Sequence, residues 1–377
     1  MKSLKTVLVC FYEAYPAASG SASVTYNIAK YLQGETVLIQ LGRQKSHECT
    51  EDGLRLITLV SASDNRLQKL RGLFGLIKEI AEIIKSTSPD TIILEGGSWV
   101  LYHWLLFRQL RRQRSDAKIV YHAHNVEYYL RKEKHGRIVT WVTRWAEGRL
   151  LKEADLSFAV SSVDSAQFAK LYKVSPELLP NGVDYRRFNK IMEKEISAVK
   201  SEYGLEDNVV FFMGFYLYKP NREAIDFLVE EVMPKVILRC PNAKLVIIGS
   251  KVPYSNPWLI NPGSVPYEHV PAICRSCRIG VAPIFSGSGT RLKILEYMAA
   301  GKPVISTTKG AEGLNVIEGT NILLADNADD FADAVIRLLT DQDLAASIGE
   351  GGRDMVNINY SWEVIMEDFN KRLSALK

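Results

Sequence analysis

A run of small and basic residues near position 290 has the composition of an anion-binding loop. The run joins small residues to two cations and a later carboxylate: Gly287, Ser288, Gly289, Thr290, Arg291, Lys293 and Glu296. A glycine loop that opens a helix presents free backbone N–H groups and the positive end of the helix dipole. The cations add full charge, and the carboxylate can accept hydrogen bonds from sugar hydroxyls. The sequence therefore predicts a cradle for the diphosphate and ribose of a nucleotide.

The residues around this loop predict the elements that position it. Residues 279–283 form a short apolar run, which is typical of a buried strand. Leu292, Leu295 and Ala299 have the spacing of a buried helix face, and Gly301 suits the left-handed position that ends a helix. The loop is neither a Walker loop nor the dinucleotide fingerprint, because Leu292 stands where a third glycine is needed. An ordinary strand–loop–helix unit with a solvated charged face is the alternative interpretation.

Strand-like and helix-like segments alternate along the whole chain. Strands are expected at residues 6–11, 37–41, 54–60, 90–94, 118–122, 156–160, 178–184, 209–213, 243–248, 262–266, 279–283 and 321–324. Helices are expected at 21–32, 66–85, 99–114, 126–153, 163–173, 267–274, 328–340, 342–350 and 363–373, and between position 222 and position 238. Because 377 residues exceed what one core usually serves, we expect two doubly wound α/β domains with parallel sheets. Sites in such sheets lie beyond the carboxyl ends of the strands.

Three segments of the first half follow strands and therefore lie where a site is expected. Gly20 and Ser21 open a helix and suit a ligand loop, with Ser21 as a simple helix cap as the alternative. Residues 95–97 allow close backbone approach to a ligand, but we favour a turn. His122 and His124 fall on one face of their strand. Two histidines without a third ligand are weak grounds for a metal site, so no metal is expected.

Charge and cysteine content limit the partners and the compartment. Residues 1–183 carry 25 Lys/Arg and 18 Asp/Glu, against 22 and 25 in the remainder, within a net charge of +4. The basic half indicates an anionic partner, although no nucleic-acid motif is present and nucleic acid is not expected. Five cysteines, an odd and sparse set, favour a reducing compartment. Cys274 and Cys277 are interpreted as two thiols on a short helix rather than half of a zinc site.

Localisation is predicted from apolar segments. The N-terminus lacks the form of a signal peptide, and no apolar run approaches the ~20 residues that span a bilayer. The sequence thus predicts a cytoplasmic protein. Residues 99–114 combine aromatic and apolar residues with arginines, which suits the inner face of an anionic membrane, with assistance from the helix at 66–85. The alternative, slightly favoured, is a crossover helix that buries its apolar face on the sheet.

The stretch from Ser286 to Ile305, continued to Leu314, resembles the nucleotide-sugar signature of glycosyltransferase family 4 and its relatives. Those enzymes have the GT-B fold, with two Rossmann-like domains and a terminal helix that returns to the first. The resemblance implies an N-terminal acceptor-side domain at 1–183 plus 359–377 and a C-terminal donor domain at 184–358. It also implies retaining transfer of a sugar from a UDP- or GDP-sugar to a hydroxyl acceptor, in glycan, surface-polysaccharide or glycolipid synthesis. Neither metal nor cofactor is implied.

The resemblance assigns roles to individual residues. His124 is placed near the transferring sugar, where it would donate or accept a hydrogen bond, although a histidine that caps the next helix is the alternative. Gly20 and Ser21 correspond to a loop against the donor diphosphate or the acceptor. Arg291 and Lys293 are expected to carry the positive charge that stabilises the leaving diphosphate.

The sequence departs from the family pattern at three places. Many relatives grip the diphosphate with an arginine and a lysine after the glycine that matches Gly214, but Phe215 and Asn221 stand there. Many also have a sugar-contacting glutamate where Ser288 stands, while Glu296 remains in place for the ribose. The changed positions give weight to one rival function, a non-catalytic sugar-nucleotide-binding subunit. The cradle alone does not exclude a second rival, a nucleotide-sugar 2-epimerase on the same fold.

Overall fold

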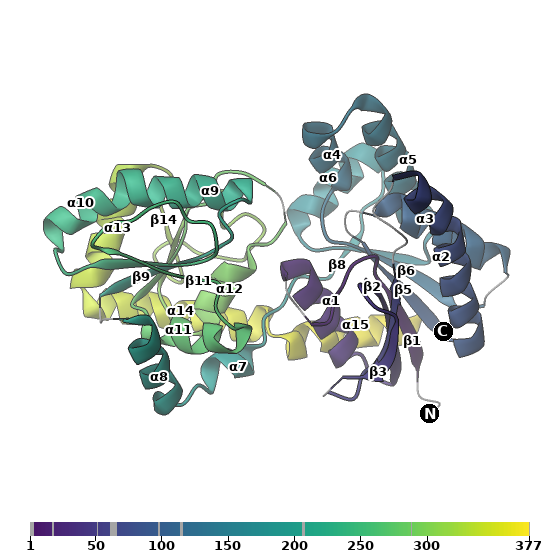
Figure 1. Ribbon diagram of the computed structural model, residues 1–377, viewed down its shortest axis with the longest axis horizontal. Helices are drawn as coiled ribbons and strands as arrows, with labels where there is room; N and C mark the ends of the chain where they lie inside the picture. Colours follow the sequence, from purple (N-terminus) through teal and green to yellow (C-terminus); the bar gives the residue numbers. More distant parts are fainter. Residues whose placement is uncertain are drawn as a thin grey trace. The chain divides into compact units, whose positions relative to one another are not determined.

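A computed structural model describes residues 4–16, 19–50, 52–60, 66–96, 99–113, 116–205, 208–287 and 289–376. The chain divides into two compact units, residues 1–181 with 362–377, and residues 182–361. Each unit is a mainly parallel sheet covered by helices, which confirms the predicted α/β class (Figure 1). The divisions lie two or three residues from the domain bounds expected from the sequence.

The first unit contains a sheet of eight strands in the order β3-β4-β2-β1-β5-β6-β7-β8 within its described residues. The strands are β1 (Lys5–Val9), β2 (Glu35–Gly42), β3 (Ser46–Cys49), β4 (Arg55–Val60), β5 (Thr91–Gly96), β6 (Lys118–Ala123), β7 (Leu156–Ala159) and β8 (Glu177–Leu178). The helices are α1 (Gly20–Tyr31), α2 (Arg66–Thr87), α3 (Val100–Arg112), α4 (Glu127–Lys134), α5 (Arg137–Glu153), α6 (Ser162–Tyr172) and α15 (Trp362–Ala375). The edge strand β3 pairs antiparallel with β4 and was not expected from the sequence.

Alternate residues along each central strand of the first unit face different helical layers. Ile92 of β5 and Tyr121 of β6 join one core cluster with Ile80 of α2, Leu106 of α3 and Leu150 of α5. Since this cluster buries the apolar face of α3, the crossover-helix interpretation of residues 99–114 is confirmed. The membrane hypothesis for residues 99–114 stays a prediction, and the packed apolar residues of α3, such as Leu106 and Leu110, are not exposed for it.

The last helix, α15, completes the first unit after the chain has built the second. Its Phe369 packs edge-on against Phe158 of β7, with the ring centroids 5.1 Å apart. The Asn370 side chain caps the end of α1, because its Oδ1 accepts from Gln33 N at 3.0 Å and its Nδ2 donates to Tyr31 O at 3.1 Å. These contacts tie the final segment to the first.

The second unit contains a six-stranded parallel sheet in the order β11-β10-β9-β12-β13-β14 within its described residues. The strands are β9 (Val209–Met213), β10 (Lys244–Ile248), β11 (Leu259–Gly263), β12 (Ile279–Ala282), β13 (Val304–Ser306) and β14 (Leu323–Leu324). The helices are α7 (Tyr185–Asn189), α8 (Glu193–Tyr203), α9 (Lys219–Asp226), α10 (Met233–Arg239), α11 (Val270–Ser276), α12 (Leu292–Ala299), α13 (Ala328–Thr340) and α14 (Gln342–Asn359), with a π-helical turn at Phe227–Val232 and a 3-10 turn at Tyr267–His269. Helices α7 and α8 were not expected from the sequence.

Two local predictions in the first unit were wrong. Helix α1 is capped by Ser19, whose side chain accepts from Ala22 N at 3.3 Å, and not by Ser21. Residues 95 and 96 continue β5 instead of forming a turn, while Gly97 lies outside the described residues. A Cβ on Gly96 would lie 2.7 Å from His122 O, so the glycine allows β6 to approach closely. No helix among the described residues has the length and apolar content to span a membrane.

Candidate functional site

The predicted anion loop lies at the point where the strand order of the second sheet reverses. The chain leaves β9 toward β10 on one side, whereas β12 pairs with β9 on the other side. The segments that follow β9 and β12 therefore start from adjacent strand ends. This is where ligands bind in open α/β sheets.

Two glycines shape the backbone of the loop between β12 and α12. Gly287 and Gly289 adopt φ values of +91° and +81°, which other residues rarely adopt. A Cβ on Gly287 would lie 3.3 Å from Pro220 Cγ of α9. The Ser286 side chain anchors the loop by donating a 2.5 Å hydrogen bond to Glu223 of α9. The loop is thus fitted closely to α9, while Ser288 lies outside the described residues.

Lys293 and Asn221 connect the two segments. Lys293 Nζ donates to Asn221 Oδ1 at 2.9 Å and lies 4.1 Å from the centroid of the Phe212 ring. Asn221 Nδ2 in turn donates to Phe215 O at 3.2 Å. Asn221 also fills the space beside Gly214, where a Cβ would lie 2.6 Å from its Cγ. The asparagine that replaces the family lysine therefore positions the lysine supplied by α12.

Burial changes the charges of this site. Desolvation, together with the nearby Arg291 guanidinium, lowers the pKa of Lys293 to about 7. Desolvation raises the pKa of Glu296 to about 7, opposed by the charges of Lys293 and Arg187. An anion that reaches Lys293 would restore the full charge of the ammonium group, because opposite charge favours the charged form.

The remaining loop residues contribute donors near the start of α12. The Arg291 guanidinium donates to the Gly289 and Ser286 carbonyl oxygens, so it lies along the loop rather than in solvent. The buried Thr290 hydroxyl has no hydrogen-bond partner within the described part of the chain. Helix α12 begins at Leu292 without a side-chain cap. Its first N–H groups thus add donors to those of the glycine loop.

The structure brings most of the predicted donor-site residues together in the second unit. They are Gly214, Asn221, Gly287, Gly289, Thr290, Arg291, Lys293 and Glu296. Lys219, a nearby lysine of α9, is directed at Glu223, with 3.5 Å between Nζ and Oε1. Gly20, Ser21 and His124 belong to the first unit.

His124 lies in a buried polar cluster at the carboxyl ends of β5 and β6. His124 Nε2 lies 2.7 Å from Glu95 Oε2, and His122 Nδ1 lies 3.1 Å from the same oxygen. The Thr25 hydroxyl of α1 donates to this oxygen at 3.3 Å. The two histidines share one face as predicted, but Glu95 was missed because the sequence pattern suggested a turn there. The shared carboxylate fixes both rings.

The same cluster adds a third side chain, Glu95, to the two histidines that the sequence placed on one face. Within the described ranges, Glu95, His122 and His124 form the one group of three such side chains close enough to share a cation, with ligand atoms within 4.8 Å of one another. Their separations are those of hydrogen bonds, and Thr25 also donates to the carboxylate. The histidine charges hold the pKa of Glu95 well below its usual range, while desolvation lowers the pKa of His124. A hydrogen-bonded network accounts for the cluster.

Comparison with known proteins agrees with this geometry. The model of the family "Glycosyltransferase Family 4" matches residues 18–187, and that of "Glycosyl transferases group 1" matches residues 207–341. Two Rossmann-like units in one chain are the architecture of the GT-B fold. The chain belongs to the glycosyltransferase family 4-like enzymes and is a hexosyltransferase that uses nucleotide-sugar donors.

Two of the similar curated proteins are named as GDP-mannose-dependent mannosyltransferases. A Corynebacterium glutamicum protein, the GDP-mannose-dependent monoacylated alpha-(1-6)-phosphatidylinositol monomannoside mannosyltransferase, is 26% identical over 64% of this chain and 68% of its own length. A Mycolicibacterium smegmatis GDP-mannose-dependent alpha-(1-6)-phosphatidylinositol monomannoside mannosyltransferase is 28% identical over 60% of this chain and 65% of its own length. The chain thus spans about two thirds of these relatives.

Solved structures share the fold over the full chain. Anabaena HepE, solved with UDP and glucose, has a TM-score of 0.76 at 15% identity and covers 99% of this chain and 100% of its own. The sucrose-phosphate synthase of Thermosynechococcus elongatus has a TM-score of 0.79 at 17% identity, with 99% of both chains covered. At these identities the likeness concerns the fold.

Proposed function

We propose that the protein transfers mannose from GDP-mannose to a hydroxyl group of a lipid-linked glycan, with retention of the anomeric configuration and without a metal ion. The observation that carries this proposal is Lys293, held by Asn221 beside a glycine loop at the start of α12. The donor and the acceptor class are taken from the names of the two mannosyltransferase relatives.

The residues of the cradle supply the main catalytic device. When the bond between the anomeric carbon and the phosphate oxygen breaks, the leaving GDP gains negative charge. Donors fixed before the reaction stabilise such charge more than solvent does. Lys293, Arg291 and the N–H groups around Gly289 would supply them, because all lie at the start of α12. Glu296, one turn further along α12, would accept from the ribose hydroxyls.

The proposed reaction does not need a dedicated base to remove the proton of the acceptor hydroxyl. As the acceptor oxygen forms its bond to the anomeric carbon, its proton passes to the phosphate oxygen that leaves. In this proposal His124 hydrogen-bonds the transferring sugar and moves no proton. Its Nε2 is engaged by Glu95, which leaves Nδ1 for the sugar.

A thermal-shift screen tests the donor. GDP and GDP-mannose should raise the melting temperature more than UDP and UDP-glucose at equal concentration, because only ligands that bind the native state stabilise it. Addition of EDTA should leave the GDP shift unchanged if no metal takes part. A larger shift with UDP would refute the guanine donor, and a shift abolished by EDTA would refute metal-independence.

Product analysis tests the reaction. With GDP-mannose and a lipid-linked glycan, NMR should show a new α-mannoside, since the donor sugar is α-linked. A β-product would refute retention. Conversion of the donor sugar in the absence of any acceptor would instead support the 2-epimerase, and donor binding without product across an acceptor panel would support a binding subunit.

A further inference from the structure

The outward face of α5 is apolar where a surface helix is usually polar. Ile138 is 80% exposed, Trp141 is 66% exposed, and Trp145 follows one turn later. Arg149 and Lys152 continue the same stripe toward the end of the helix. The opposite face of α5 already packs into the core through residues such as Leu150. The exposed stripe is therefore a second, unpartnered apolar face with a basic end, which we call the α5 face.

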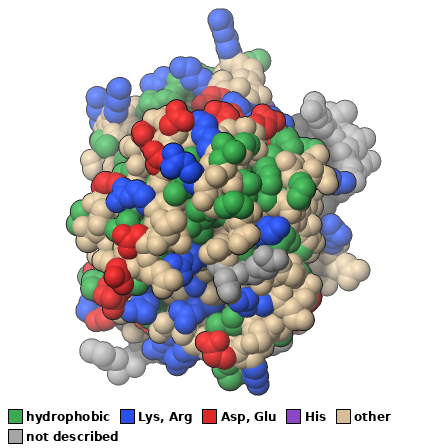
Figure 2. Space-filling view, turned by 90° about the vertical axis from the view of Figure 1, so that its left-hand side faces the viewer, with side chains coloured by type: hydrophobic (Ala, Val, Ile, Leu, Met, Phe, Trp, Pro, Cys, Tyr) green, Lys and Arg blue, Asp and Glu red, His purple; other side chains and the backbone are tan. Residues whose placement is uncertain are grey.

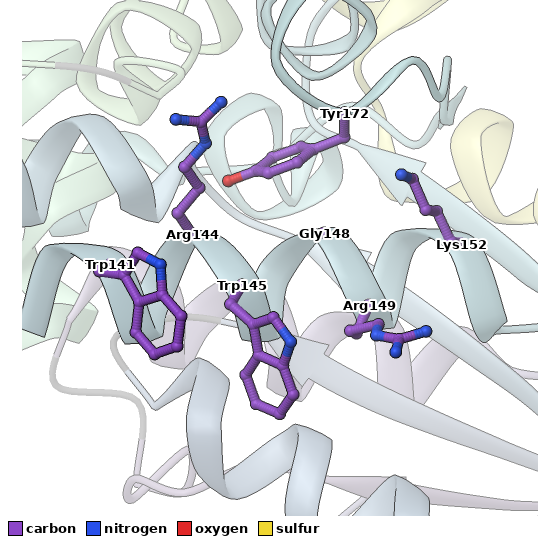
Figure 3. Close-up of a pocket in the computed structure, with 7 residues that line it drawn as sticks. All are labelled: Trp141, Arg144, Trp145, Gly148, Arg149, Lys152 and Tyr172. Atoms are coloured by element: carbon purple, nitrogen blue, oxygen red, sulfur yellow. The ribbon is translucent and has the colours of Figure 1, made fainter.

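The α5 face contains a formed pocket. It encloses about 390 Å³ and is lined by Trp141, Arg144, Trp145, Gly148, Arg149, Lys152 and Tyr172. Figure 3 shows the two indole rings and Arg149 on one side of α5, with Arg144 extending to the side of Tyr172. Trp145 is fixed by an edge-on contact with Trp104 of α3, with the ring centroids 4.3 Å apart. The aromatic part of the face is thus held in place.

The charge of this region is strongly one-sided. Between positions 131 and 153 the sequence has seven Lys/Arg and three Asp/Glu. Glu147 points inward, where it accepts from Glu127 N at 2.8 Å and from the Tyr172 hydroxyl at 2.6 Å, and Glu153 pairs with Arg149 at 2.7 Å. The outward surface therefore presents cations beside exposed aromatic and aliphatic side chains.

We propose that the α5 face is a docking surface for an anionic lipid bilayer. Tryptophan and aliphatic residues beside Lys and Arg are the composition that binds a lipid interface, where rings enter the headgroup region and cations contact phosphates. Ile138 and Trp141 enter the bilayer, while Arg144, Arg149 and Lys152 bind lipid phosphates. This inference goes beyond the proposed reaction and moves the membrane contact from α3, whose apolar face is buried, to α5.

Vesicle flotation tests the proposal without donor or acceptor, so its outcome is independent of the proposed reaction. The protein should float with vesicles of phosphatidylcholine and phosphatidylglycerol at low salt and less with phosphatidylcholine alone. Binding should weaken as salt increases, because salt screens the attraction of surface charges. Failure to bind anionic vesicles at low salt would overturn the proposal.

A double variant places the interaction on α5. Trp141→Ser with Arg144→Ala should lower the partition coefficient by roughly 50-fold, about fivefold from the charge and about tenfold from the ring. The matched control is Leu238→Ser with Arg239→Ala on α10, where Leu238 is 82% exposed. Figure 2 views the C-terminal unit from this side and shows acidic and basic side chains interspersed. The control should leave partitioning unchanged.

The remaining outcomes separate lipid from other anionic partners. Both double variants should keep the wild-type melting temperature and far-UV circular dichroism spectrum, which shows that the fold is intact. Equal loss of vesicle binding in the two variants would overturn the assignment to α5. Binding of single-stranded RNA that displaces the vesicles and is lost with the α5 variant would overturn the lipid assignment in favour of nucleic acid.

Discussion

Replacement of Lys293 by methionine tests the central assignment. In the free protein the Lys293 amine is partly buried, lies 2.9 Å from Asn221 Oδ1, and has its pKa lowered to about 7 by desolvation. A methionine of similar length avoids the cost of a buried charge. We therefore expect the free energy of unfolding to stay within about 1 kcal/mol of the wild type.

The loss should appear in nucleotide binding and in turnover. A hydrogen bond to a charged group contributes about 1.5–3 kcal/mol. Its removal should raise the Kd for GDP by roughly 10- to 150-fold. Turnover should fall further, by about 10²–10³, because the charge of the leaving diphosphate increases in the transition state.

Calorimetry with GDP and a transfer assay measure the two effects, and Lys219→Met is the matched control. Lys219 is highly exposed and pairs with Glu223 on the same helix as Asn221. Its loss should change the Kd for GDP by less than about twofold, since a surface ion pair contributes little. Wild-type GDP affinity in Lys293→Met, or an equal loss in Lys219→Met, would refute the assignment.

Three further predictions follow from the site and its surroundings. The pKa of free Lys293 is about 7, and GDP favours its ammonium form. GDP binding should therefore take up a proton, and the Kd for GDP should rise up to roughly tenfold per pH unit above pH 7. Calorimetry in two buffers measures the proton uptake, and the same pH dependence of the Kd in Lys293→Met would contradict this prediction. Glu95→Met should lower the free energy of unfolding by about 1–3 kcal/mol, because a buried histidine N–H loses its acceptor, and an unchanged urea midpoint would disprove the shared-carboxylate role. Gly249→Ala should lower the free energy of unfolding by at least about 1–3 kcal/mol, because its Cβ would lie 1.9 Å from the backbone oxygen of Gly214, just after β9. Gly75→Ala in α2 has open space around it and should raise the free energy of unfolding by about 1 kcal/mol. Equal urea midpoints for the two variants would contradict the steric reason.

The cradle was predictable because its determinants are local. Glycines with positive φ, a strand before them and a periodic helix after them are all visible within residues 279–301. The contact between Lys293 and Asn221 was not predictable, since it joins residues 72 positions apart through the order of the strands. From the sequence alone, Asn221 was only an uncharged residue at a position where many relatives have a lysine. In the structure it accepts a hydrogen bond from Lys293 and positions that side chain.

In the first unit, too, contacts between distant parts of the chain were not predictable from the sequence. The alternation of His122 and His124 placed both rings on one face, but the partner that fixes them, Glu95, lies on the neighbouring strand. Residues 99–114 left a membrane helix and a crossover helix open, because composition does not reveal which face of α3 is buried. Helices α7 and α8 were missed because their short segments follow the turn at the domain boundary.

The return of α15 to the first unit has a consequence for biosynthesis. The chain crosses between the units at 181–182 and again at 361–362, and Val183 N donates to Tyr360 O at 2.8 Å. The second unit is therefore an insertion in the sequence of the first, and its two ends are hydrogen-bonded to each other. It can complete its fold during synthesis before the final helix of the first unit has been made. A gene fragment for residues 182–361 should accordingly yield a self-contained nucleotide-binding module, whereas removal of the last sixteen residues should leave the first unit incomplete.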